Sequence, residues 1–297
     1  MLSNEERLER TRLGVASQIP NLASSLETNG YENQLAFVVP TEHVVLPSKG
    51  LFYSEDHPLY RKDTIEIKQL TTKEEDILTN RSLIKKGIVI DKLLESLIVN
   101  RNIDTQSLLI GDRNAILLAA RRTGYGDDYG ITANCTNCGA KNSVNLNLTT
   151  FLEESEVKLE KKLENIDSNN ASVLENGNIV IKLPKTNWIV ECKLLNGRDE
   201  LYLLNLSEAK KKSSINEDIT IAEQLSIMIV AIQMVTDKQR IIEAIRNMPA
   251  ADSKFLRKTY QECSPSFDMK TEVECKSCGN QSEVEVGFNQ EFFWPNR

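Results

Sequence analysis

Residues 135–148 read CTNCGAKNSVNLNL, and residues 275–288 read CKSCGNQSEVEVGF. The two stretches share Cys, Cys, Gly and Val at the same offsets, and apolar residues alternate with polar ones beyond each glycine. Such alternation is typical of any half-buried strand, but a repeated Cys-x-x-Cys-Gly needs another cause. Each copy therefore predicts a strand, a tight knuckle and a second strand. Helical sequence precedes both copies, which suggests two helical lobes that each end in a β-arm.

Four cysteines in these knuckles have the chemistry of a metal site. A Cys-x-x-Cys-Gly turn directs two sulfurs at one cation, and its glycine accepts the positive φ that the turn often needs. Structural zinc takes four ligands in a tetrahedron. We therefore predict one structural Zn²⁺ per chain, bound by Cys135, Cys138, Cys275 and Cys278. The pairs lie much farther apart than in an ordinary zinc ribbon, so the segment between them must fold as an insertion.

Other uses of the four thiols stay open at this point. A redox dithiol would need a thioredoxin-like βαβ setting, which the sequence does not offer. An iron–sulfur cluster also takes four cysteines, and disulfides or unliganded thiols are further alternatives. The two single cysteines, Cys192 and Cys263, are interpreted as small buried hydrophobes.

Composition narrows the class of protein. The chain has 297 residues, a net charge of −7 and a pI of about 5.2, which argues against a broad nucleic-acid-binding surface. No apolar run reaches the roughly 18 residues that span a membrane. The first residues lack the apolar core of a signal peptide, so we expect a cytoplasmic protein, where paired cysteines favour metal over disulfides.

The fold class expected is α+β, with mainly helical lobes and β-hairpin arms joined by a zinc-ribbon-like site of four cysteines. Its segments are an N-terminal arm at 1–34, an extended segment with a helical lobe and the first knuckle at 35–148, a polar insert with a strand pair at 149–196, and a second helical lobe at 197–297. This last segment also carries the second knuckle and an aromatic tail.

Some local expectations depend on periodicity and capping alone. The insert predicts a short helix or strand followed by a loop, and Asp91 is expected to cap a helix. The apolar stretch Asp218 to Val235 predicts one buried helix. The aromatic tail around Phe292, Phe293 and Trp294 is either an anchor for a partner's pocket or packs on the chain's own knuckle.

Motifs of catalysis are missing from the sequence. There is no Walker loop, no Gly-x-Gly-x-x-Gly after a strand and no Gly-x-Ser-x-Gly elbow. The histidines, His43 and His57, stand at no metal or triad spacing. Zinc held by four protein ligands leaves no open position for hydrolysis. We therefore predict that the chain is not an enzyme.

Several segments together resemble a known family. They are VVLPSKGLFY at 44–53, TIEIKQLTTKEEDIL at 64–78, IDTQSLLIGDRNAILLAARRTGYG at 103–126, the first knuckle, and FFWP at 292–295. These segments look like those of the T4-type phage baseplate hub and hub-assembly family. The resemblance is closest over residues 40–150 and looser at the second knuckle. The chain is longer than the shortest members of that family, and its polar insert at 149–178 leaves a one-to-one correspondence of roles open.

The resemblance implies a structural or assembly role at the tail tip of a contractile phage, in the virion or in the host cytoplasm during assembly. It implies contacts with other baseplate hub proteins and the tape-measure protein, within a symmetric oligomeric assembly. A Pro-punctuated extended segment suits strand addition to such neighbours. The alternative is a zinc-ribbon adaptor in viral transcription or nucleic-acid processing.

Overall fold

A computed structural model describes residues 39–164, 171–212, 219–267, 270–285 and 290–293. Contacts divide the chain after Val39, and the second unit is Pro40–Arg297. All elements described below belong to the second unit. The predicted N-terminal arm at 1–34 lies outside the described residues, and the finer division of the rest into segments stays a prediction.

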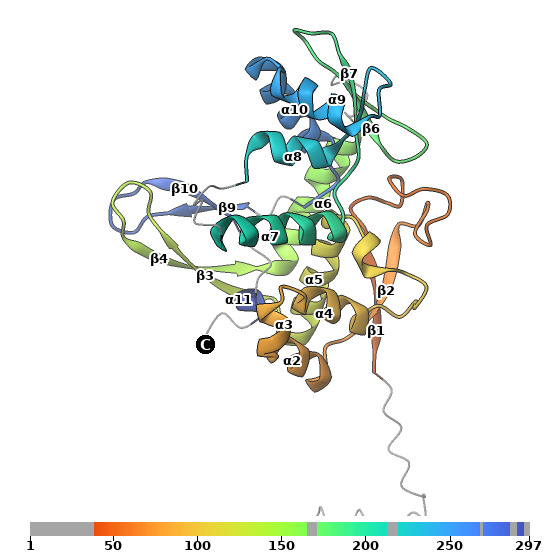
Figure 1. Ribbon diagram of the computed structural model, residues 1–297. Helices are drawn as coiled ribbons and strands as arrows, with labels where there is room; N and C mark the ends of the chain where they lie inside the picture. Colours follow the sequence, from red (N-terminus) through yellow and green to blue (C-terminus); the bar gives the residue numbers. More distant parts are fainter. Residues whose placement is uncertain (1–38, 165–170, 213–218, 268–269, 286–289, 294–297) are drawn as a thin grey trace, which may run out of the picture. The chain divides into compact units, whose positions relative to one another are not determined.

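The second unit mixes helices with small antiparallel sheets, as expected (Figure 1). In chain order its elements are β1 (Thr41–Val45), β2 (Thr64–Lys68), α2 (Thr72–Thr79), α3 (Arg81–Lys85), α4 (Val89–Leu97), η1 (Thr105–Ser107), α5 (Ile110–Tyr125), β3 (Asp128–Asn134), β4 (Lys141–Asn147), α6 (Leu148–Glu164), β5 (Ala171–Val173), β6 (Ile179–Lys182), β7 (Ile189–Cys192), α7 (Gly197–Lys212), α8 (Ile221–Met228), β8 (Ile229–Ile232), α9 (Lys238–Arg246), α10 (Ala250–Cys263), β9 (Lys270–Glu274), β10 (Gln281–Glu285) and α11 (Gln290–Phe293).

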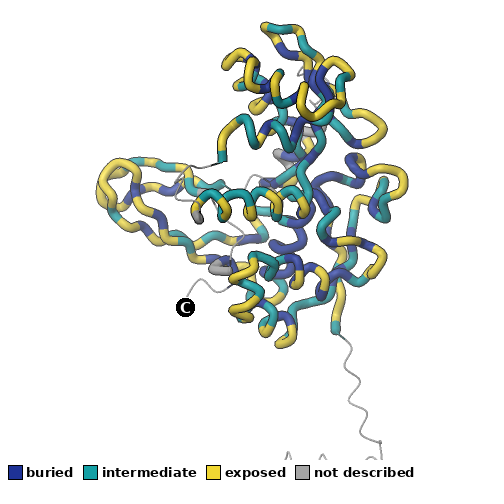
Figure 2. The backbone as a smooth tube through the Cα atoms, viewed as in Figure 1, coloured by how far each residue is buried: buried dark blue, intermediate teal, exposed yellow. Residues whose placement is uncertain are grey.

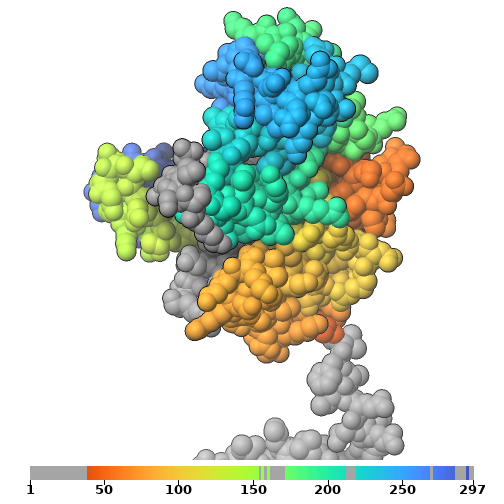
Figure 3. Space-filling model, viewed as in Figure 1, coloured from red at the N-terminus to blue at the C-terminus, as the bar shows by residue number. Residues whose placement is uncertain are grey.

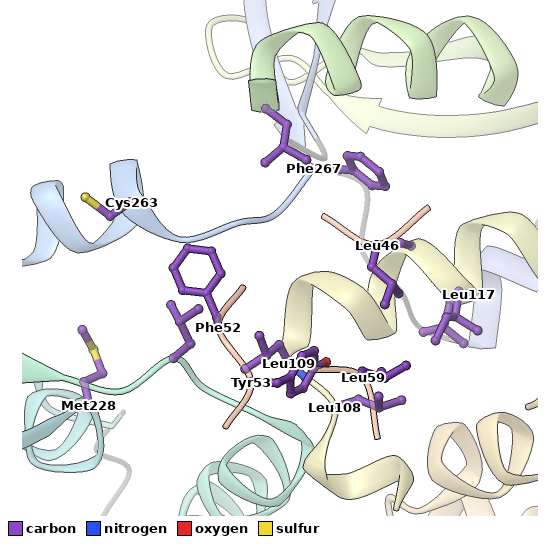
Figure 4. Close-up of a cluster of buried hydrophobic side chains, with 14 of the residues drawn as sticks. Leu46, Phe52, Tyr53, Leu59, Leu108, Leu109, Leu117, Met228, Cys263 and Phe267 are labelled. Carbon is purple, nitrogen blue, oxygen red and sulfur yellow. The ribbon is translucent and has the colours of Figure 1, made fainter. Parts of the chain in front are cut away.

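Helix α5 lies at the centre of the core. Almost every residue from Gly111 to Arg121 is buried, and α5 contacts β1, β2, α4, α6, α7 and α11. Figure 4 shows Leu108, Leu109 and Leu117 in one cluster of buried side chains with Leu46 and Phe52, which follow β1. Buried residues are densest in this region, whereas buried and exposed residues alternate along β3 and β4 (Figure 2). One contiguous apolar core thus ties sequence-distant segments together.

A buried carboxylate fixes the turn after β1 to α5. Asp112 is fully buried and accepts hydrogen bonds from the Ser48 backbone N–H (3.0 Å), the Ser48 hydroxyl (2.7 Å) and the Tyr53 hydroxyl (2.7 Å). Tyr53 in turn accepts from the Leu109 N–H at 3.1 Å. Burial raises the pKa of the Asp112 carboxyl, and the hydrogen bonds from Ser48 and Tyr53 oppose that shift. The turn at residues 47–50, which we call the PSKG turn, is therefore held by hydrogen bonds to Asp112.

The expected helix from Asp218 to Val235 is wrong at its C-terminal end. Helix α8 ends at Met228, and Ile229–Ile232 continues as strand β8 of a four-stranded sheet ordered β5-β6-β7-β8. The segment IVAI is rich in β-branched residues and pairs with β7, with Val190 opposite Ile232. An apolar run suits a buried helix and a buried strand equally, so pairing with β7 decides its state.

Two further local expectations are corrected. The insert contains a longer helix than predicted, α6, which is followed by strand β5 beyond residues 165–170. Asp91 does not cap α4, because the N-cap position is Ile88. Instead Asp91 pairs with buried Arg113 on α5 at 2.7 Å. The carboxylate therefore joins two helices rather than ending one.

The aromatic residues at the end of the described chain are buried. Phe292 and Phe293 lie on α11, which contacts α5, and the Phe292 ring meets Tyr129 edge-on at 5.0 Å. The carbonyl of Phe292 accepts a hydrogen bond from Arg121 Nε at 3.1 Å. A role for these two rings as exposed anchors is therefore wrong, and they pack at the base of the first knuckle's hairpin. Trp294 lies outside the described residues.

Candidate metal centre

The two knuckles have the same local structure. Strands β3 and β4 pair antiparallel, as do β9 and β10, and each pair forms a separate two-stranded sheet. In the first knuckle the Cys135 N–H donates to the Ala140 carbonyl, and the Gly139 N–H to the Cys135 carbonyl, both at 2.9 Å. The second knuckle repeats both bonds at Cys275, Asn280 and Gly279, with lengths of 2.9 and 2.8 Å.

The glycine of each knuckle explains why the motif ends as it does. Gly139 has φ of 72° and Gly279 has φ of 68°. This left-handed conformation is costly for residues that carry a Cβ, and it turns the chain directly into the second strand. The repeated Cys-x-x-Cys-Gly is thus the sequence requirement of one hairpin turn used twice.

The hairpins bring all four predicted ligands together. Cys135 Sγ lies 3.7 Å from Cys278 Sγ, Cys138 Sγ lies 3.6 Å from Cys275 Sγ, and all four sulfurs lie within 4.8 Å of one another. Zinc at the centre of a tetrahedron with bonds of about 2.3 Å would place its sulfurs about 3.8 Å apart. The cysteines are free thiols rather than disulfides. The group can therefore hold a tetrahedral metal ion. Figure 1 shows the two hairpins that carry it, β3–β4 and β9–β10, side by side.

Backbone hydrogen bonds favour the thiolate form of Cys135 and Cys275. Backbone N–H groups of Cys138 and Asn137 lower the pKa of Cys135, and the N–H of Ser277 lowers the pKa of Cys275 to about 6. The Ala140 N–H likewise lowers the pKa of Cys138, but the neighbouring thiols Cys278 and Cys275 outweigh it and raise the value to about 12. Closely spaced thiolates repel one another, so full ionisation of all four requires a cation.

Asparagines that the sequence reading did not single out connect the two hairpins. Asn142 is buried, and its side-chain oxygen accepts a hydrogen bond from the Lys276 backbone N–H at 3.0 Å. The side-chain amide of Asn137 donates to Cys278 Sγ at 3.7 Å, and that of Asn280 approaches Cys135 Sγ at 4.0 Å. The sequence shows that Asn142 follows Cys138 by four residues, but it does not show that this side chain is buried. Its role therefore could not be predicted from the sequence.

The hairpins β3–β4 and β9–β10, which together we call the arm, have buried residues of their own. Ala133 and Val273, each two residues before the first cysteine of its knuckle, are buried together with Cys135 and Cys275, and none of these belongs to the main core. A two-stranded hairpin alone is marginally stable in water. The hairpins therefore depend on contacts beyond their own strand pairing, such as the hydrogen bond between Lys276 and Asn142 and the approach of the four cysteines.

The other residues singled out in the sequence lie elsewhere. Cys192 and Cys263 are buried in the main core, as predicted, and burial raises the pKa of Cys192 to about 12. The His57 ring stacks on the Tyr53 ring with 4.2 Å between their centroids, and His57 Nε2 lies 2.8 Å from the Ser107 hydroxyl oxygen. Within the described residues, no metal-ligating group of three or more other than the four cysteines occurs.

Comparison with known families decides the class of protein. A family model described as T4 bacteriophage base plate protein matches residues 41–294. The chain belongs to this base plate protein family. The match covers both knuckles and everything between them. Comparisons with curated proteins and with solved structures give no match.

Membership of the base plate protein family confirms the resemblance seen in the sequence, at the level of the T4-type baseplate. It indicates a structural role in a phage tail baseplate, where the chain contacts other baseplate components. In the described part of the chain, no helix is both long and apolar enough to cross a membrane.

Removal of the Asn142 side chain tests how the hairpins are coupled. Asn142→Ala removes the acceptor of the Lys276 N–H, and the loss of this partly buried hydrogen bond costs about 0.5–1.5 kcal/mol. We expect hydrogen exchange of the Lys276 amide to speed up by about two- to tenfold. Asn145→Ala, at an exposed position of the same strand, is the control and should leave that rate unchanged. Equal rates in both variants would contradict the role of Asn142.

Proposed function

We propose that this baseplate protein is a hub component or hub-assembly factor of a contractile tail, with one zinc ion as a structural staple. Cys135, Cys138, Cys275 and Cys278 would bind the ion and join the first helical lobe to the last part of the chain. The observation that carries the proposal is the meeting of four sulfurs from two distant hairpins in a member of the base plate family.

The proposed role is structural rather than catalytic. Zinc bound by four protein sulfurs has no open coordination position, so its contribution is to stabilise the arm. The arm exposes much of its strand surface, including Thr132, Ser143 and Asn145, and its sheets have only two strands each. Exposed strands of this kind suit contact with a neighbouring subunit.

The partners proposed are other hub proteins and the tape-measure protein, within a symmetric assembly. Baseplate membership supports contact with baseplate components. The choice of the hub among them is the finer part of the proposal. The same membership favours this role over a zinc-ribbon adaptor in transcription.

A pull-down tests the proposal directly. The tagged full chain is expressed with the neighbouring tail genes of its phage and purified, and its eluate is analysed by mass spectrometry and for zinc. We expect hub and tape-measure proteins and about one zinc per chain. Recovery of peripheral baseplate proteins alone would reject the hub assignment. Recovery of polymerase subunits or nucleic acid would favour the adaptor, and an eluate without zinc would reject the staple.

A further inference from the structure

A groove whose lining contains none of the four knuckle cysteines lies where α7, α8, β8 and α9 meet. It has a volume of about 460 Å³. Its buried floor includes Ile229 at the start of β8 and Ile241 of α9, each 4% exposed, and half-buried Ile227 and Val230 extend this apolar surface. We name it the α7–β8 groove. Figure 3 shows the surface of α7 between those of α2–α4 and α8–α10.

The rim of the α7–β8 groove is aromatic and cationic. Tyr202 of α7 is 57% exposed although it lines the groove. Three cationic side chains line it, Lys193, Arg198 and Lys238, against a single carboxylate, Asp199. The chain as a whole carries a net charge of −7, so this local excess of positive charge runs against the average surface.

One of the two ion pairs at the rim is exposed enough for a ligand to exchange it. Lys193 Nζ lies 2.6 Å from Asp199, whose side chain is only 12% exposed. Arg198 pairs with Asp104, which does not line the groove, and these side chains are 63% and 50% exposed. Exposed pairs contribute about 0–1 kcal/mol, so an incoming carboxylate can compete for Arg198 at little cost.

Strand β8 contributes Ile229 and Val230 to the lining of the groove. Among the described residues it is an outer strand of the β5-β6-β7-β8 sheet, paired with β7 on one side. An outer strand suits an added extended segment, because such a segment places alternate side chains on opposite faces, some against the floor and some at the rim.

We propose that the α7–β8 groove binds an extended segment of a partner protein in which apolar side chains alternate with Asp or Glu. The apolar side chains cover Ile229 and Ile241 and pack on Tyr202, while the carboxylates meet Lys238 and Arg198. This site lies beyond the zinc-staple role, and it does not depend on which baseplate protein supplies the segment.

Selection of peptides tests the groove without any phage component. The full-length protein is used to select from a displayed library of random ten-residue peptides, and the recovered peptides are measured by fluorescence anisotropy. We expect enrichment of sequences that combine apolar residues with Asp or Glu. Their affinity should fall as salt rises, because charge contributes to binding.

Matched variants locate the binding site. Tyr202→Ala and Lys238→Glu change exposed side chains, so both should fold, and each should weaken binding by about tenfold or more. Lys254→Glu makes the same charge change at an exposed site of α10 outside the groove and should have no effect. No enrichment, enrichment of basic peptides, or equal affinity in all three variants would overturn the proposal. None of these outcomes bears on zinc content or on the hub partners.

Discussion

Replacement of Cys135 and Cys138 by serine is expected to reduce bound zinc from about one ion per chain to almost none. Two sulfurs remain in the second knuckle, and two ligands do not satisfy a structural zinc site. Zinc binding is coupled to folding, and the apparent free energy of zinc binding is about 10–16 kcal/mol in small zinc domains. Loss of the ion should therefore release the arm, because each two-stranded hairpin is marginal alone.

Hydrogen exchange separates loss of the arm from loss of the whole fold. Amides of β3, β4, β9 and β10 should exchange much faster in the double variant, while those of α5 stay protected because the core around α5 does not include the knuckle residues. Cys192→Ala is the control: it removes a buried thiol outside the cluster and should keep the zinc. Full zinc content or an unchanged arm in the double variant would contradict the staple.

Replacement of Asp112 by alanine is expected to cause the second large effect, a loss of about 3 kcal/mol or more in the free energy of unfolding. The change leaves the Ser48 N–H and the Ser48 and Tyr53 hydroxyls without their acceptor in a fully buried place. For a chain of this size, such a loss lowers the melting temperature by about 6–12 °C.

Two comparisons make the Asp112 prediction specific. Asp112→Asn keeps one oxygen for the Ser48 N–H, and its amide can donate to hydroxyls that rotate, so it should cost less than alanine. Asp76→Ala removes an exposed aspartate from α2 and should change stability by less than about 0.5 kcal/mol. Equal melting temperatures for Asp112→Ala and Asp76→Ala would show that the carboxylate does not secure the PSKG turn.

Features with local causes were predictable from the sequence. Each Cys-x-x-Cys-Gly turn lies between two paired strands, as the alternating sequence around it predicts. Each depends on residues a few positions apart. The family resemblance was readable for a similar reason, since it rests on short contiguous segments.

The wrong expectations involve residues whose partners are distant in sequence. Ile229–Ile232 became a strand because β7 offers pairing, and Asp91 turned from a cap into the partner of Arg113. The choice between an anchor and self-packing for Phe292 depended on whether Tyr129 and α5 lie beside it. No local pattern distinguishes these outcomes, because apolar runs and single carboxylates suit more than one state.

By itself, the sequence determined which four cysteines can serve as ligands and what local turns present them, because the Cys-x-x-Cys-Gly knuckle is a short-range structure. Only the tertiary structure decided that the two pairs meet, that Asn142 joins their hairpins, and that cations gather beside an apolar floor in the α7–β8 groove. These features need residues from distant parts of the chain to be placed within a few ångströms of one another. Packing of the core around α5 places the floor of the groove, whereas the two hairpins meet outside that core.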